Sequence, residues 1–442
     1  MRGQLPNTDF RTQPIWWDEA PPRAEPAAAP PARSDVVVVG GGFAGLATAL
    51  ELARNGVEVT VLEADAFGFN ASARNSGGVS FGIDLTKVAR WHRWAGAKVP
   101  NVPELARAAG ESVTYMERFI ADNAVDCDYL RPGRLSCAPT PRHYDALASR
   151  VDRMNSLFDA GAHMVKRADL AAEIGSDAFH GAMVVTRSGQ LNPAKMLHGL
   201  VALCRQAGVR LHDNTVVHHV ERTAKGFSVA FAGGAIAADA VAVTINAHAA
   251  RLPAAGTAQR VVPVASHIIV TEPLPLAVAE ALLPRRRTGA DGKRLLAYFR
   301  RTPDGMRFLY GGRAAPSDVT PARSAEVLYR RMVKTFPQLD GARISHAWGC
   351  KVAFTFDGIP HLSGRDGLYY IAGCNGNGVA MTNYLGHKLA RKIIECATSV
   401  CAFDQPVFPK PPLYDGRPWF LPAMAAAYGA LDRVDALRAK RR

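Results

Sequence analysis

The sequence predicts an α/β protein in which a discontinuous Rossmann-type domain is interrupted by an inserted, mostly antiparallel β-sheet domain (α+β). Residues 35–63 have the pattern of a strand, a glycine-rich turn, a helix and a second strand. The chain then leaves this pattern and returns to strands alternating with helices only near residue 190, and again after residue 368. Between these α/β parts, residues 260–315 alternate apolar and polar side chains, as antiparallel strands do.

Composition and charge set the broad class of the protein. The 442 residues suffice for two or three folding units, and a hydrophobic content of 48% excludes disorder over most of the chain. The net charge of +14 comes from dispersed arginine and lysine, which favours a solvated basic surface and no nucleic-acid partner. Seven cysteines without repeated C-x-x-C spacing predict neither a disulfide framework nor a metal site. No secretory leader or membrane span is recognised, so we expect a cytoplasmic protein.

The region before the first strand, residues 1–34, is predicted to be an arm. Residues 20–32 are rich in proline and alanine, which favours an extended segment over a packed helix or strand. Trp16 and Trp17 precede this segment. Because two adjacent tryptophans rarely stay in solvent, we expect the arm to dock on the body of the protein.

The glycine-rich turn after the first strand predicts a dinucleotide site, since three glycines there have the spacing G-x-G-x-x-G. The first glycine permits a tight turn, the second lets a pyrophosphate approach the helix N-terminus, and the third lets the helix pack on the strand. An acid ends the second strand, where a carboxylate accepts hydrogen bonds from ribose hydroxyls. The residues expected to bind the nucleotide here are Gly40, Gly42, Phe43, Ala44, Gly45, Glu63 and Ala64.

A second glycine turn near the C-terminus, residues 373–378, indicates that the dinucleotide is FAD. A nicotinamide enzyme usually continues its Rossmann domain with further strand–helix units, whereas this chain leaves the pattern after Glu63. The helix after the second turn would present N–H groups to the pyrimidine edge of a reduced flavin and stabilise the negative charge there. The alternative is an ordinary strand-to-helix turn. The expected flavin-binding residues of this turn are Gly373, Asn375, Gly376, Gly378, Val379 and Ala380.

Further motifs follow one another along the chain, at residues 72–78, 191–193, 271–274, 310–313, 348–349, 357–360, 372–379 and 416–422. In this order, and together with the first glycine turn, they resemble the D-amino acid oxidase superfamily of flavoproteins. The similarity is greatest to the branch that contains γ-glutamylputrescine oxidase and related amine oxidases. It covers nearly all of residues 10–432 and is specific to the family, though not to a substrate.

The resemblance implies the positions of further flavin-binding residues. Val217 would lie in the strand turn on the adenine side, while Asn246 and Ala247 would close over the ribityl or pyrophosphate side. Cys350 stands seven residues before Asp357, the spacing at which sarcosine and pipecolate oxidases place the cysteine that bonds to the flavin. A buried, unreacted thiol is the favoured alternative. The residues that would run along the flavin are Arg74, Asn75, Ser76 and Gly77.

The predicted domain limits follow from these motifs. Residues 35–85, 186–258 and 341–442 are assigned to the three parts of the FAD-binding domain, the last together with a C-terminal segment. Residues 86–185 are assigned to a helical substrate region and residues 259–340 to the substrate-domain sheet.

The chemistry implied by the resemblance is oxidation of the C–N bond of an amino acid or a primary or secondary amine. A hydride would pass to flavin N5, and water would then hydrolyse the imine. By similarity to glycine and sarcosine oxidases, Arg300 and Arg301 are candidates to clamp a substrate carboxylate, although surface arginines are commoner. His267 and residues 91–94 are further candidates for the substrate cavity.

The electron acceptor stays open between oxygen and an electron carrier, with an oxidase favoured over a dehydrogenase of the same fold. A less favoured alternative is a basic flavoprotein that binds RNA or a protein partner. The sequence predicts no oligomeric state.

Overall fold

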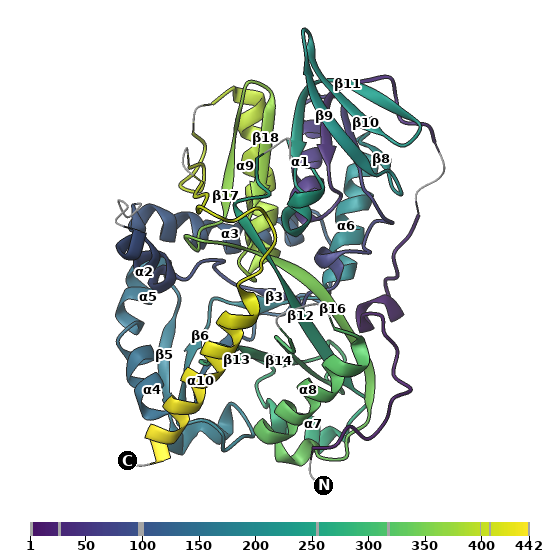
Figure 1. Ribbon diagram of the computed structural model, residues 1–442. Helices are drawn as coiled ribbons and strands as arrows, with labels where there is room; N and C mark the ends of the chain where they lie inside the picture. The colour runs from purple at the N-terminus through teal and green to yellow at the C-terminus, as the bar shows by residue number, and fades with distance from the viewer. Residues whose placement is uncertain are drawn as a thin grey trace.

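The computed structural model describes residues 3–24, 28–95, 101–252, 256–315, 319–397, 399–405 and 408–440. They form two stacked lobes, each built around an eight-stranded sheet (Figure 1). The helices are α1 (Phe43–Arg54), α2 (Leu85–Ala95), α3 (Val102–Asp122), α4 (Pro141–Ala148), α5 (Val151–Phe158), α6 (Pro193–Gln206), α7 (Leu276–Leu282), α8 (Pro321–Thr335), α9 (Gly378–Glu395) and α10 (Leu421–Lys440). Short 3₁₀ helices include η1 (Ile15–Asp18), η2 (Ala71–Ala73) and η4 (Asn246–Arg251).

The strands are β1 (Arg33–Val39), β2 (Val59–Leu62), β3 (Gly78–Val79), β4 (Arg134–Ala138), β5 (Ala162–Lys166), β6 (Gly181–Val185), β7 (Gly189–Gln190), β8 (Arg210–His212), β9 (Val217–Thr223), β10 (Gly226–Phe231), β11 (Gly234–Val243), β12 (Val261–Thr271), β13 (Thr288–Asp291), β14 (Ala297–Arg301), β15 (Phe308–Gly312), β16 (Ile344–Thr355), β17 (His361–Arg365) and β18 (Leu368–Ala372). The short strands β3 and β7 pair with each other, outside both large sheets.

The first sheet lies in the upper lobe of Figure 1, with β18, β11, β1, β2 and β8 as parallel neighbours in that order. The β9–β10 hairpin pairs antiparallel with β11, and β17 pairs antiparallel with β18. Alternate valines of β1 point to opposite faces of the sheet. Val36 and Val38 pack in the cluster that contains α1, whereas Val37 and Val39 pack against the β9–β10 hairpin. The predicted Rossmann-type domain, built from separate chain segments, is confirmed.

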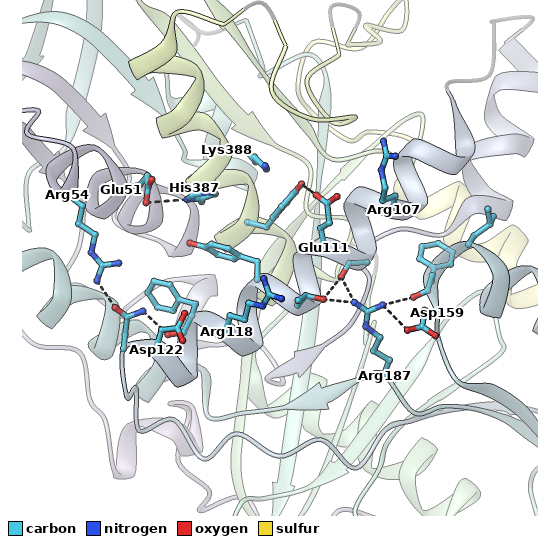
Figure 2. A pocket seen from close by; sticks show the side chains of 18 of the residues that line it. Glu51, Arg54, Arg107, Glu111, Arg118, Asp122, Asp159, Arg187, His387 and Lys388 are labelled. Atoms are coloured by element: carbon cyan, nitrogen blue, oxygen red, sulfur yellow. Dashed lines mark hydrogen bonds and ion pairs between the residues drawn. The ribbon is translucent and has the colours of Figure 1, made fainter.

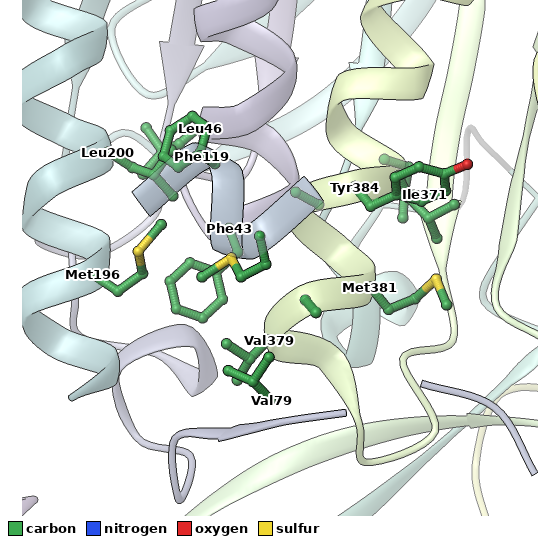
Figure 3. Close-up of a cluster of buried hydrophobic side chains, with 14 of the residues drawn as sticks. Phe43, Leu46, Val79, Phe119, Met196, Leu200, Ile371, Val379, Met381 and Tyr384 are labelled. Carbon is green, nitrogen blue, oxygen red and sulfur yellow. The ribbon is translucent and has the colours of Figure 1, made fainter. Parts of the chain in front are cut away.

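Two helices of this lobe pack so closely that glycine is required at their contacts. A Cβ atom at Gly45 would lie 1.9 Å from the carbonyl oxygen of Gly40, which fixes α1 close to the end of β1. A Cβ atom at Gly386 would lie 2.5 Å from the carbonyl oxygen of Ala44, which brings α9 against α1. The apolar cluster that α1, α6 and α9 enclose, shown in Figure 3, includes Phe43, Leu46, Met196, Leu200, Val379 and Tyr384.

The second sheet has the order β16-β12-β15-β14-β13-β4-β6-β5, and only β13 and β4 run parallel. Residues that pair across strands share a face, so its two faces can be assigned from the register. Ile269 and Ala347 lie on one face and pack with residues of α8. Ile268 and Trp348 lie on the opposite face and pack with the apolar cluster of the upper lobe. The predicted, mostly antiparallel second sheet is therefore confirmed.

The strands of this sheet come from three stretches of the chain. β4, β5 and β6 belong to residues 86–185, which the sequence assigns to a helical substrate region. β16 belongs to residues 341–442, which the sequence assigns to the FAD-binding domain, yet it pairs along its length with β12. The strand pairing therefore joins parts of three predicted chain segments into one sheet.

The N-terminal arm crosses both lobes. Trp16 in η1 is buried, and its indole Nε1 donates a hydrogen bond to the carbonyl oxygen of Asn75 at 2.9 Å. Trp17 packs against Phe69, with 5.7 Å between the ring centroids. The arm is thus docked beside the segment that precedes β3. None of the helices in the described ranges is long and apolar enough to cross a membrane.

Candidate functional site

The first glycine turn forms an open approach to the N-terminus of α1. Gly40 has a φ of +103°, which favours glycine, and Gly42 precedes the helix with an extended backbone. A Cβ atom at Gly42 would lie 2.8 Å from Ser72 Oγ. The backbone N–H of Phe43 donates to the same hydroxyl at 3.1 Å. The turn therefore presents a helix N-terminus and a hydroxyl, with no side chain at Gly42 to fill the approach, which fits a pyrophosphate.

Glu63 directly follows β2, beside this turn. Its carboxylate accepts hydrogen bonds from the backbone N–H of Gly41 at 2.6 Å and of Asp65 at 3.2 Å. Burial raises the pKa of Glu63, while the Gly41 N–H opposes the shift. The half-buried Ala64 follows Glu63 directly, and the backbone N–H of Thr215 donates to the Glu63 carbonyl oxygen. The carboxylate is thus held at the edge of the sheet, where a ribose would lie.

The segment from Arg74 to Gly77 connects the two lobes. The Arg74 guanidinium lies 4.6 Å from the Trp17 ring, and its Nε donates to the carbonyl oxygen of Phe69 at 2.7 Å. Asn75 Oδ1 accepts a hydrogen bond from the N–H of Gly77, which has a φ of +75°. Aromatic stacking and local hydrogen bonds therefore fix this predicted flavin-side segment.

The second glycine turn is tied to η4. Asn246 Oδ1 accepts a hydrogen bond from the N–H of Gly373 at 2.9 Å, while the neighbouring Ala247 packs beside β16. Asn375 Oδ1 accepts from the N–H of Thr355 at 2.9 Å, so β16 holds the same turn from the other lobe. The predicted residues 246, 247, 373 and 375 thus lie together, although far apart in sequence.

The helix α9 begins without a side-chain cap, because Asn377 at its N-cap position forms no capping hydrogen bond. Gly376 just before it is exposed, and a Cβ atom there would meet only Phe354 and Val352, at 3.7 and 4.0 Å. Val379 and Ala380 are buried in the first turn of the helix. The open N-terminus fits the electron-rich edge of a flavin.

The face of the second sheet that points to the upper lobe carries a patch of partly exposed side chains, which we call the open floor. Ser266, Tyr298 and Cys350 occupy this face by strand register, and all three are half-buried. The hydroxyls of Ser266 and Tyr298 are 3.0 Å apart. Beside this floor lies a pocket of about 400 Å³, lined from α2, β16 and the second turn by Asp84, Lys87, Arg90, Trp91, Phe354, Thr355, Asn375 and Asn377, among others.

Arg300 and Arg301, the predicted carboxylate clamps, are both engaged by backbone carbonyl groups. Arg300 is 1% exposed and donates to the carbonyl oxygens of Ser76 and Leu191, both at 2.9 Å. Burial, and secondarily Arg286, lower the pKa of Arg300 to about 9. Arg301 Nε donates to the carbonyl oxygen of Gly305 at 2.8 Å. Neither guanidinium lines the pocket beside the second turn, and both are held by main-chain carbonyl groups.

His267 also lies away from the open floor. It pairs with Gly349 and Gly312 and therefore shares the sheet face of Ile269, which α8 covers. A Cβ atom at Gly349 would lie 2.9 Å from the His267 ring, so the imidazole packs across the neighbouring strand.

The predicted candidates on α2 are placed differently from one another. Trp91 lines the pocket, whereas buried His92 bonds to the carbonyl oxygen of Val88. The Trp94 side chain lies outside the described residues.

Several residues that build the site are missing from the sequence prediction. Ser72, which meets the N-terminus of α1, lies in a small, polar segment that gives no sign of this contact. Tyr298 and Phe354 alternate with buried residues along their strands, a signal that needs the strand register to be interpreted. Lys87 and Arg90 resemble ordinary charged residues of an amphipathic helix.

We expect that Cys350 forms no covalent bond with FAD. Burial raises the pKa of its thiol to about 12, although Arg74 opposes the shift, and the thiolate is the reactive form. Acid precipitation of the purified protein should therefore release FAD into the supernatant. Recovery of the flavin on the peptide that contains Cys350, with loss in Cys350→Ala but not in the exposed-site control Cys396→Ala, would contradict this prediction.

A larger pocket, of about 690 Å³, lies among α3, α5 and α9 and contains none of the predicted site residues (Figure 2). Several of its charged groups bond to other groups of the protein: Tyr384 donates to Glu111 at 2.7 Å, and His387 lies 3.3 Å from Glu51. Arg187 donates to the carbonyl oxygen of Phe158 at 2.8 Å. These contacts stabilise the helical layer, and the pocket is separate from the two glycine turns.

Comparison with known proteins shows which proteins this chain resembles. Residues 35–392 match the family described as FAD dependent oxidoreductase. The chain is 30% identical over 406 residues to gamma-glutamylputrescine oxidoreductase of Escherichia coli (strain K12), covering 90% of this chain and 93% of that protein. It is 28% identical over 392 residues to the probable oxidoreductase OrdL of Rhizobium meliloti (strain 1021), covering 85% and 87%.

Solved structures show the same fold at lower identity. Glycine oxidase from Geobacillus kaustophilus is similar with a TM-score of 0.72 and 23% identity, over 86% of this chain and 99% of that one. L-proline dehydrogenase from P. horikoshii is similar with a TM-score of 0.70 and 21% identity, over 85% and 97%.

Proposed function

Because the chain belongs to the family of FAD-dependent oxidoreductases, we propose that it oxidises the C–N bond of an amino acid or of a primary or secondary amine. One observation carries the proposal: the pocket beside the second glycine turn is lined by that turn, by β16 and by α2. A small molecule in this pocket would lie next to the uncapped N-terminus of α9. When bound, FAD would supply the acceptor for a hydride from the carbon next to nitrogen, leaving an imine that water hydrolyses.

The side chains around the pocket suit positioning better than proton transfer. Burial raises the pKa of Tyr298 above that of an ordinary tyrosine, so its hydroxyl stays a neutral hydrogen-bond donor. Phe354 and Trp91 give the pocket apolar walls, which exclude water and favour the unprotonated form of a substrate amine. The N–H groups of α9 stabilise negative charge that develops at its N-terminus. Orientation and local charge are therefore the expected contributions of the protein.

An amine should reduce the flavin of the purified protein in the absence of oxygen, without NAD and without a metal. The test is anaerobic mixing with a panel of amines and amino acids, followed by the loss of visible flavin absorbance. Matched hydroxy acids and alcohols serve as controls. If a hydroxy acid bleached the flavin and every amine left it oxidised, the proposed C–N oxidation would be wrong.

The electron acceptor can be tested in the same preparation. Because relatives of this fold carry the names of both an oxidase and a dehydrogenase, the fold alone leaves the acceptor open. We propose oxygen. After reduction by an amine, admission of air should restore the flavin absorbance during turnover, whereas reoxidation only by an added electron-accepting dye would identify a dehydrogenase.

A further inference from the structure

Two basic side chains line the pocket beside the second glycine turn, and two more lie close to them. Lys87 and Arg90 lie on α2 and line the pocket, while Arg134 begins β4 and Arg313 follows β15. Lys87 is within electrostatic reach of all three arginines. Pairing of β4 with β13 and of β13 with β14 places Arg134 on the same sheet face as Tyr298. The Arg313 guanidinium lies 4.9 Å from the Phe354 ring.

The protein offers little negative charge to balance this group. The nearest acid is Asp84, whose Oδ2 lies 4.0 Å from Lys87 Nζ. Asp84 Oδ1 is engaged at the start of α2, where it accepts a hydrogen bond from the N–H of Thr86 at 3.0 Å. Among the residues that the structure describes, Arg90, Arg134 and Arg313 form no ion pair with an acidic side chain.

The larger pocket in the helical layer provides a contrast within the same protein. Its basic residues Arg54, Arg107, Arg118, Arg187 and Lys388 are nearly balanced by Glu51, Glu111, Asp122 and Asp159. A basic overall composition therefore does not by itself produce an unbalanced pocket. The excess of positive charge beside the second glycine turn is local, and like charges held together destabilise a protein unless an anion binds between them.

The spacing of the arginines indicates more than one anionic group. Arg134 and Arg313 lie on or next to strands separated by three steps of the sheet, and at about 4.8 Å per step their backbones are at least roughly 14 Å apart. A single carboxylate is too small to bond both guanidinium groups from its two oxygens unless both side chains lean fully inward. Two carboxylates on one molecule match the arrangement better.

The following inference rests on the proposed function. We propose that the substrate is a dianionic amine, meaning an amino acid with a second carboxylate on its side chain or on its nitrogen substituent. Arg134 and Arg313 hold separate carboxylates, and Lys87 and Arg90 add positive charge at the mouth of the pocket. The C–N bond then lies between the two anchored ends, beside the second glycine turn.

The first test measures binding without turnover. Calorimetric titration of the FAD-loaded protein compares glutarate with valerate, two five-carbon acids that differ by one carboxylate. Glutarate should bind at least about 10-fold more tightly. Arg134→Gln and Arg313→Gln should each weaken glutarate about 10-fold. Lys87→Gln should weaken glutarate binding less, because this side chain is exposed at the mouth of the pocket. For the same reason, we expect this variant to fold normally. Arg93→Gln, an exposed charge on α2 outside the pocket lining, is the matched control and should change nothing.

The second test uses substrates. Iminodiacetate and sarcosine are secondary amines that differ by one carboxylate, and glutamate tests a side-chain carboxylate. Faster flavin reduction by iminodiacetate than by sarcosine would support an N-linked second carboxylate, and preference for glutamate over 2-aminobutyrate would support a side-chain one. If monoanionic amines reduced the flavin equally well and glutarate bound no better than valerate, this inference would be overturned while the proposed function stood. If no amine reduced the flavin, the proposed function itself would fail.

Discussion

Gly42→Leu should abolish the retention of FAD while leaving most of the fold intact. The backbone of Gly42 is extended, with φ −82° and ψ −175°, so leucine causes no backbone strain there. Its Cβ atom, however, would lie 2.8 Å from Ser72 Oγ, and the rest of the side chain would fill the approach to the N-terminus of α1. We expect FAD affinity to fall by at least about 100-fold, because the pyrophosphate loses its contact with the helix.

The measurement is the ratio of flavin to protein after purification and after titration with added FAD. Wild-type protein should carry one FAD per chain, and the variant should be colourless with a native circular dichroism spectrum. Gly110→Ala is the matched control, since a Cβ atom at this position in α3 meets nothing nearer than 3.8 Å. A yellow Gly42→Leu protein would show that the nucleotide does not bind at this turn.

The parts of the fold that depend on local pattern could be predicted from the sequence. The spacing of Gly40, Gly42 and Gly45 after a run of valines requires a strand, a tight turn and a closely packed helix, and the structure contains these elements. The second glycine turn and the early departure from the Rossmann pattern indicated FAD as the cofactor, which membership of the family confirms. Steric limits on glycine are local, so they can be identified without knowing the tertiary structure.

The parts that depend on strand register could not be predicted. β12 is apolar on both faces, so its sequence does not indicate whether Ser266 or His267 points to the site. A shift of one residue exchanges the two faces, and pairing with β16 assigns Ser266 to the open floor. The same limit applies to β16 itself, which carries Cys350 and joins a sheet built mainly from other parts of the chain.

Arg300→Met should destabilise the protein strongly rather than change its preference among substrates. The guanidinium donates to the carbonyl oxygens of Ser76, Leu191 and Arg301, and its centre lies 5.4 Å from the Trp16 ring. It thereby joins β14, the segment before β3, the start of α6 and the N-terminal arm. Methionine has a similar length but no donor, so three carbonyl groups lose a charged hydrogen-bond donor in a buried position. We expect the free energy of unfolding to fall by about 4 kcal/mol.

Chemical unfolding followed by circular dichroism tests this prediction, with FAD retention as a second readout because Ser76 lies in the predicted flavin-side segment. Arg153→Met, at an exposed arginine of α5, is the control and should change stability by less than about 0.5 kcal/mol. A substrate clamp would behave differently: its loss would raise KM for carboxylate substrates and leave stability unchanged. That second pattern in Arg300→Met would restore the role predicted from the sequence, because it would show that the bonds from Nε and Nη1 to main-chain carbonyls contribute little to stability.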